Sequence, residues 1–280
     1  MDILVSTDWL AQRLDEEAIV VLDASRHLPA AGRDPMSEFE TAHIPGARFL
    51  DLASLSDKQS PVPSALPSAA QLAERLAQLG VRSGDTIVLY DDSAVKTSAR
   101  AWFALKAHGL DKVAILDGGF GKWQAEARPI ESGIPAPAPA NPMALRDAID
   151  VRFKSDMLAN LESGTEQVID ARGADRVFGT GIDPVHGGQN GRIPGSLNLP
   201  FGKVFDEDGT FLPPDQIKAA FAHAGMDFGA PVVATCGSGV TASVLLFALA
   251  LIGKQDAALY DGSWQEWEAD PDTPKAQGNA

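Results

Sequence analysis

Three sequence patterns occur twice in this chain, in the same order and at nearly the same spacing. Each second copy lies 144 to 149 residues after the first: position 170 is equivalent to 23, position 192 to 43 and position 261 to 117. Three ordered matches at one offset indicate a duplicated domain. The paired segments are Val20–Arg26 with Val168–Arg172, His43–Ala47 with Arg192–Ser196, and Leu116–Phe120 with Tyr260–Trp264.

A proline-rich segment marks the joint between the copies. Residues 129–142 contain five prolines and show neither helical nor strand periodicity, which is typical of a semi-rigid linker. A chain of 280 residues also suits two domains better than one. We therefore expect a non-catalytic domain over residues 1–130, a linker over 131–145 and a catalytic domain over 146–280.

Short apolar runs alternate with helical segments in both halves. Strand–helix alternation with almost continuously apolar strands predicts a parallel sheet covered by helices on both faces, so each half is expected to be a small α/β domain. The expected strands are Ile19–Leu22, Thr86–Tyr90, Val113–Leu116, Gln167–Ile169, Pro231–Thr235 and Ala257–Tyr260. The expected helices include Ala69–Leu79, Ser98–Ala107, Pro214–Ala224 and Thr241–Ile252.

The charge and the apolar runs exclude several classes of partner. The formal net charge is −15, and a surface this acidic repels nucleic acid and anionic lipid. The longest apolar run, Ala242–Ile252, is too short to span a bilayer and suits a buried helix. The first residues, Met1–Leu4, do not resemble a secretion signal, so we expect a cytoplasmic protein.

The chain contains a single cysteine, which excludes internal disulfides and Cys-based zinc clusters. Cys236 follows an apolar strand and precedes a helix, and the loop between them is Gly-Ser-Gly. Two glycines allow successive backbone N–H groups to converge, and the following helix adds the positive end of its dipole. Such a site favours a reactive thiolate, and ligands of open α/β sheets bind at this end of the strands.

Several interpretations of Cys236 compete. An inert buried cysteine is the commonest fate of a lone thiol, but the glycine-rich loop argues against it. A phosphatase is disfavoured because the seventh loop position, where it needs arginine, is Ala242, and no local signal supports a protease histidine. A small cradle of N–H groups suits a sulfur atom carried as a persulfide, which must leave on an external acceptor because no second cysteine can resolve it.

The segment Cys236–Thr241 resembles the active-site loop of 3-mercaptopyruvate sulfurtransferases in the two-domain rhodanese family. The similarity extends over residues 3–270. The corresponding loops of thiosulfate-using rhodaneses typically carry one or two basic residues, whereas the loop of this chain has only glycine and serine at these positions. The further matching segments are Arg33–Asp34, Glu38–Glu40, His43–Ala47, Asp117–Gly119, Asp170–Arg172 and Asp261–Trp264. The resemblance implies two tandem rhodanese-like domains and an enzyme that needs no cofactor beyond the transferred sulfur. No metal site is expected, because His27, His108 and His223 are scattered without ligand spacing.

The implied reaction moves sulfur from a donor to the Cys236 thiolate and then to a thiol or cyanide. Gly237, Gly239, Val240 and Thr241 are expected to surround the bound sulfur. In the first copy Asp91 takes the place of Cys236, and the carboxylates of Asp91 and Asp92 occupy a position that should accept negative charge. The first domain is therefore expected to act as a scaffold.

Positive charge for the donor's carboxylate is expected from Arg176, which matches the family's first substrate arginine. The family's second arginine falls at Val185, which is followed by His186. His186 is the candidate replacement, although a histidine is only partly charged at neutral pH. Arg172 is interpreted as a structural residue of the pocket wall, and Trp264 and Trp267 as core residues.

Ser238, His43 and Asp34 match positions proposed in the family as a Ser–His–Asp relay that assists cleavage of the donor's C–S bond. Two simpler interpretations stay open. In one, the Ser238 hydroxyl donates a hydrogen bond directly to the sulfur. In the other, His43 only caps a turn before Ile44 and Pro45.

The predicted function is sulfur transfer from 3-mercaptopyruvate to a thiol or cyanide. Thiosulfate is the alternative donor, and a persulfide-sensing binding module is the alternative class. The expected partners are a small-molecule donor and a thiol acceptor, for which a thioredoxin-like protein is one candidate. We expect a monomer that binds neither nucleic acid nor membrane.

Overall fold

The computed structural model describes residues 2–278. Met1, Asn279 and Ala280 lie outside this range, and with them the first residue of one predicted domain and the last two of the other. The chain divides into two compact units. Unit 1 comprises residues 1–57, 66–149 and 206–211, and unit 2 comprises 58–65, 150–205 and 212–280. The proline-rich segment, through Ile149, therefore groups with unit 1.

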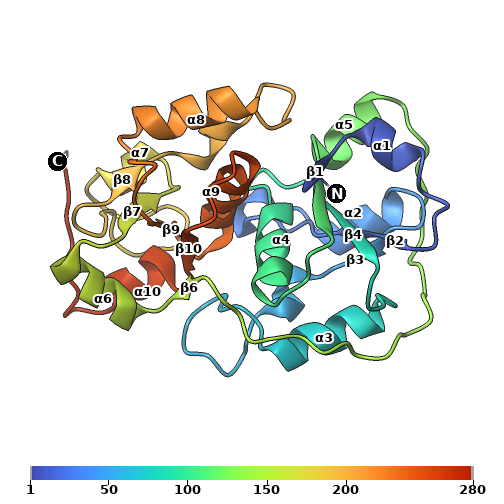
Figure 1. Cartoon of the computed structure of the whole chain (residues 1–280), viewed down its shortest axis with the longest axis horizontal. Helices are drawn as coiled ribbons and strands as arrows, with labels where there is room; N and C mark the ends of the chain where they lie inside the picture. The colour runs from blue at the N-terminus through green and yellow to red at the C-terminus, as the bar shows by residue number, and fades with distance from the viewer. Residues whose placement is uncertain (1, 279–280) are drawn as a thin grey trace. The chain divides into compact units, whose positions relative to one another are not determined.

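Unit 1 contains a five-stranded parallel sheet in the order β1-β5-β4-β2-β3 (Figure 1). Its strands are β1 Leu4–Val5, β2 Ile19–Asp23, β3 Arg48–Phe49, β4 Thr86–Tyr90 and β5 Val113–Leu116. Its helices are α1 Thr7–Ala11, α2 Pro35–Thr41, α3 Ala69–Gln78, α4 Ser98–Ala107 and α5 Gly119–Ala125, with 3₁₀ turns at Pro29–Ala31 and Leu52–Leu55.

Unit 2 repeats this arrangement with the strand order β6-β10-β9-β7-β8, again all parallel. Its strands are β6 Val151–Arg152, β7 Gln167–Asp170, β8 Leu197–Asn198, β9 Val232–Thr235 and β10 Ala257–Tyr260. Its helices are α6 Lys154–Ser163, α7 Ala174–Val177, α8 Pro214–His223, α9 Val240–Leu251 and α10 Ser263–Ala269, with a 3₁₀ turn at Phe201–Val204.

Each sheet is buried on both faces, as the apolar strands predict. In unit 2, one core cluster joins Met157 of α6 and Trp267 of α10 to alternate residues of the central strands. Helix α9, shown dark red in Figure 1, packs against β9 and β10, and all but its ends are buried. The two-domain α/β prediction is confirmed, because the strand orders of the two units are identical.

No helix among residues 2–278 is long and apolar enough to cross a membrane. Helix α9 contains the longest apolar run of the sequence except its last residue, Ile252, and lies within unit 2.

Candidate active site

Cys236 lies directly after β9, at the carboxyl edge of the unit 2 sheet, and is 2% exposed. The loop that follows is held against the start of α10. The carbonyl oxygens of Cys236 and Gly237 accept hydrogen bonds of 2.9 Å from the backbone N–H groups of Trp264 and Gln265. All peptide bonds of the described residues are trans, so the N–H of each peptide points opposite to its carbonyl. The N–H groups of Gly237 and Ser238 therefore face away from α10, into the loop.

The start of α9 completes this cradle. Gly239 adopts a φ of +79°, a left-handed conformation that residues with a Cβ rarely take, and it precedes the first helical residue, Val240. The first N–H groups of a helix have no acceptor within the helix, and they carry the positive end of its dipole. Val240 and Thr241 thus bring anion-favouring N–H groups to the loop that contains Cys236.

Gly237 allows His186 to approach the loop closely. A Cβ added at Gly237 would lie 2.2 Å from His186 Cε1, 2.7 Å from Nδ1 and 3.0 Å from Nε2. The first two distances are shorter than real Cβ contacts, so a larger residue at position 237 would require the imidazole or the loop to shift. The structure thus brings His186 and the Cys236 loop together, although they are far apart in the sequence.

Arg176 connects His186 to a buried carboxylate. Arg176 Nε and Nη2 donate to the two oxygens of Asp183 at 3.0 and 2.6 Å, and Nη2 also lies 3.0 Å from His186 Nδ1. Burial alone would raise the pKa of Asp183, but hydrogen bonds from Arg176 and from the Val185 N–H outweigh it and hold the pKa below its usual range. Asp183 is therefore a charged partner of Arg176.

Arg172 is buried in the wall of the same site. Its guanidinium lies 2.6 Å from Asp170, donates to the Gly191 carbonyl oxygen and stacks over the Trp264 ring at 4.8 Å. Trp264 and Trp267 are both buried, as core packing predicts. The charges of Arg172 and Arg176 are thus balanced by Asp170 and Asp183.

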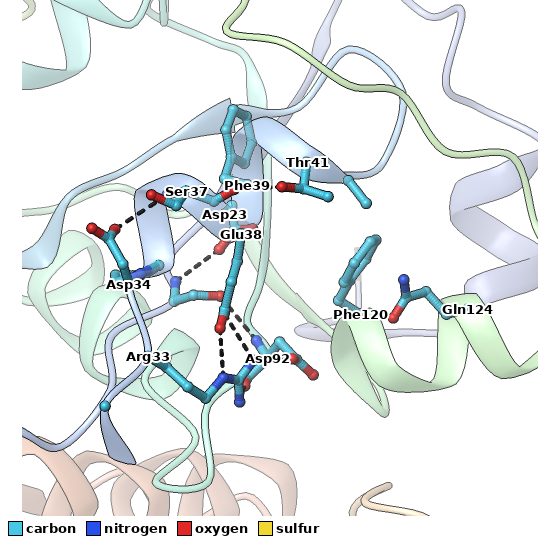
Figure 2. Close-up of a pocket in the computed structure, with 14 residues that line it drawn as sticks. Asp23, Arg33, Asp34, Ser37, Glu38, Phe39, Thr41, Asp92, Phe120 and Gln124 are labelled. Atoms are coloured by element: carbon cyan, nitrogen blue, oxygen red, sulfur yellow. Dashed lines mark hydrogen bonds and ion pairs between the residues drawn. The ribbon is translucent and has the colours of Figure 1, made fainter. Parts of the chain in front are cut away.

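Asp34 lies in unit 1, where it caps helix α2. One of its carboxylate oxygens accepts hydrogen bonds from the N–H groups of Met36 and Ser37; Figure 2 shows Asp34 beside Ser37. Asp34 also lines a cavity of about 510 Å³ in this unit, beside Arg33, which bridges Glu38 and Asp92 (Figure 2).

His43, also in unit 1, is 1% exposed and stacks on Phe39. Its Nδ1 lies 2.7 Å from the Phe39 carbonyl oxygen, and its Nε2 has no hydrogen-bond partner among the described residues. Within unit 1 the structure therefore gives His43 and Asp34 separate backbone partners, not the His–Asp hydrogen bond that the relay requires. The His43 ring thus contacts the end of α2 through Nδ1, and the Ser–His–Asp relay stays a prediction.

Two functional contacts were missed from the sequence. Asp183 was not identified as the partner of Arg176, and Ser263, whose hydroxyl accepts from the Cys236 N–H at 3.2 Å, was not singled out. Both act through irregular loops, where no periodicity relates sequence spacing to contact. Among residues 2–278, no cluster of three or more His, Cys, Asp or Glu side chains is placed to hold a metal ion.

Comparisons with known proteins agree with this geometry. A model of the rhodanese-like domain matches residues 6–126 and 153–270. The 3-mercaptopyruvate sulfurtransferase of Mus musculus is 41% identical over 94% of this chain and 91% of its own length. A thiosulfate sulfurtransferase of Cricetulus griseus is 36% identical over 99% of this chain and 96% of its own length.

Among solved structures, the 3-mercaptopyruvate sulfurtransferase SseA of Escherichia coli is 34% identical and has a TM-score of 0.85. The match covers 94% of this chain and 99% of SseA. Two matched domains, full-length relatives and a shared structure lead to one conclusion: the chain belongs to the rhodanese family of sulfurtransferases.

Proposed function

We propose that this protein transfers sulfur from 3-mercaptopyruvate to a thiol acceptor through a persulfide on Cys236. The observation that carries the proposal is the Cys236 loop itself. Hydrogen bonds from α10 fix its carbonyls on one side, which leaves the N–H groups of Gly237 and Ser238 on the side where an anionic sulfur needs donors.

In the first half-reaction, the Cys236 thiolate attacks the sulfur atom of 3-mercaptopyruvate. The new S–S bond forms as the donor's C–S bond breaks, and the electron pair of that bond passes to carbon. The proton of the donor thiol ends on this carbon, so the products are pyruvate and a Cys236 persulfide. Ser238, whose side chain is partly exposed beside the cradle, is proposed to assist this proton movement.

In the second half-reaction, an acceptor thiolate attacks the outer sulfur of the persulfide. A new persulfide forms on the acceptor, and the Cys236 thiolate is regenerated. Because Cys236 is the chain's only cysteine, the acceptor must be a separate molecule. A small thiol or a thioredoxin-like protein fits this role, and free thiols place the reaction in a reducing compartment such as the cytoplasm.

Charge balance favours 3-mercaptopyruvate over thiosulfate. The two arginines near the loop, Arg172 and Arg176, are each paired with an aspartate, Asp170 and Asp183, and the loop itself contributes no cation. A dianion such as thiosulfate needs more positive charge than a monoanionic 2-oxo acid does. Thiosulfate is retained as the second candidate, because a thiosulfate sulfurtransferase is among the full-length relatives.

The test is steady-state sulfur transfer from each donor, with Cys236→Ser as the control. We expect a higher kcat/KM with 3-mercaptopyruvate and a loss of at least about 10³-fold in Cys236→Ser, because a hydroxyl does not replace a thiolate nucleophile. Serine is close in size to the buried cysteine, so far-UV circular dichroism should not change. Preference for thiosulfate would overturn the donor assignment. Inactivity with both donors would favour the persulfide-sensing module.

A further inference from the structure

His186 occupies the part of the site where the sequence lacks a second arginine. The position that would carry this arginine is Val185, which is 37% exposed, and the side chain of the next residue, His186, packs on Gly237. The side chain of His186 is 19% exposed. It lies against Gly237, the residue that follows Cys236 in the chain. The imidazole is therefore placed to touch a donor molecule bound at the loop.

The contact with Arg176 fixes which ring nitrogen carries the proton. A guanidinium has hydrogen-bond donors only, so Nδ1 of His186, 3.0 Å from Arg176 Nη2, must act as the acceptor. In a neutral imidazole the single proton then sits on Nε2. Asp183 holds Arg176 through two hydrogen bonds, which keeps this orientation in place.

Burial and the neighbouring arginines disfavour the charged form of the ring. Burial, and next the positive charge of Arg176, lower the pKa of His186, with a smaller contribution from Arg172. Asp183, 3.8 Å from Nδ1, opposes the shift without reversing it. Protonation would also turn Nδ1 into a donor facing the Arg176 donor.

The Nε2–H group is left available to a ligand. Within residues 2–278, no backbone or side-chain acceptor pairs with it, while Nδ1 and the His186 backbone N–H both have partners. We propose that His186 determines donor specificity by giving an Nε2–H hydrogen bond to the carboxylate of the 2-oxo acid, with Arg176 and Asp183 as its positioning residues. This inference rests on the proposed sulfurtransferase function and names the group that replaces the missing cation.

The kinetic test compares His186→Leu, which has no donor, with His186→Gln, whose amide offers an acceptor and a donor in place of Nδ1 and Nε2. A neutral hydrogen bond made equally in the ground and transition states affects KM alone. We expect His186→Leu to raise KM for 3-mercaptopyruvate about 3- to 10-fold, with kcat within about 2-fold. His186→Gln should recover most of this loss. Ile182→Ala, a change at a 65% exposed side chain of the same loop, is the matched control and should change neither constant.

The tautomer is tested separately by ¹⁵N NMR of the imidazole nitrogens in the full chain, with His186→Gln identifying the signals. We expect the pattern of a neutral ring protonated on Nε2 at pH 7. A proton on Nδ1, or unchanged KM in His186→Leu, would overturn the inference. An active Cys236→Ser variant would instead contradict the proposed function. The tautomer measured by NMR does not depend on sulfurtransferase activity, so the two failures can be distinguished.

Discussion

At the scale of single residues, the duplication places the same aspartate in two environments. Asp23 and Asp170 are the last residues of β2 and β7, and each accepts a hydrogen bond from the backbone N–H two residues later. In unit 2 that residue is Arg172, whose guanidinium pairs with Asp170. In unit 1 it is Ser25, which supplies no charge. Burial therefore raises the pKa of Asp23 from 3.8 to about 6, against the hydrogen bonds from Ser25.

This shift makes the stability of the protein depend on pH. Because the folded-state pKa is raised, the native state favours the protonated carboxyl. The resulting stability is present below about pH 4 and is lost as the pH rises through 6. At pH 8, the buried carboxylate is expected to lower the free energy of unfolding by up to about 3 kcal/mol.

Asp23→Asn tests this dependence, because asparagine keeps the acceptor for the Ser25 N–H and carries no charge. We expect the variant to be more stable than the wild type at pH 8 by up to about 3 kcal/mol, with the difference vanishing near pH 4. Urea unfolding at a series of pH values measures it. A constant difference between pH 4 and 8 would show that Asp23 titrates normally.

At the scale of elements, the two strand–loop–helix units show how one copy lost the cradle. The carbonyl oxygen of Asp91 accepts from Phe120 N–H, as that of Cys236 does from Trp264 N–H. The Asp91 side chain, however, accepts from the N–H groups of Ser93 and Ser98 at 2.8 Å. The carboxylate thus fills the space where the other copy is proposed to hold sulfur. The loop to α4 is also longer than the loop to α9.

A cysteine alone is therefore not expected to restore a site in unit 1. In the double variant Asp91→Cys, Cys236→Ser, we expect sulfur transfer at the level of Cys236→Ser. We also expect the free energy of unfolding to fall by about 2 kcal/mol, because two buried N–H groups lose their acceptor. Steady-state assays and urea unfolding measure both effects. Recovered turnover would show that the strand end, and not the loop, determines reactivity.

The sequence predicts the central elements well and the peripheral ones poorly. The ranges of β4, β5, β10 and α4 match the expected segments, because apolar runs bounded by turn residues carry a clear pattern. The outer strands β1, β3, β6 and β8 contain two residues each, too few to show any periodicity. They form because the neighbouring central strand supplies the hydrogen-bond partner.

The site shows a similar division. Cys236, Gly239 and Val240 are predictable because consecutive residues build the loop and the helix start. The contact of His186 with Gly237 and the pairing of Arg176 with Asp183 are not, because the loop between α7 and β8 is irregular. Its path depends on tertiary hydrogen bonds such as that from the Gln189 N–H to Glu268.

At the scale of the whole molecule, net charge and local charge act differently on the donor. The chain carries a formal net charge of −15, which repels every anionic donor at long range. Near Cys236, the paired arginines and aspartates provide no net positive charge to offset this repulsion. The donors are expected to bind through directed hydrogen bonds more than through attraction to a positive field.

Salt should therefore raise kcat/KM, since it screens the repulsion. Between about 0.01 and 0.15 M ionic strength the screening length falls from about 30 to 8 Å. Over this range we expect kcat/KM to increase for both donors. The slope of log kcat/KM against ionic strength should be about twice as steep for thiosulfate, which is a dianion, as for 3-mercaptopyruvate. Assays at fixed pH with two different salts measure the slope. A decrease with salt for either donor would reveal a net positive site.

The most direct test of the central claim is a single-turnover loading experiment. The wild-type protein is mixed with 3-mercaptopyruvate in the absence of any acceptor, and its mass and the modified peptide are measured by mass spectrometry. The account predicts the gain of one sulfur atom on the peptide that contains Cys236, release of one pyruvate per chain, and loss of the added sulfur when a thiol is supplied. An unmodified Cys236 after pyruvate has been released would contradict it.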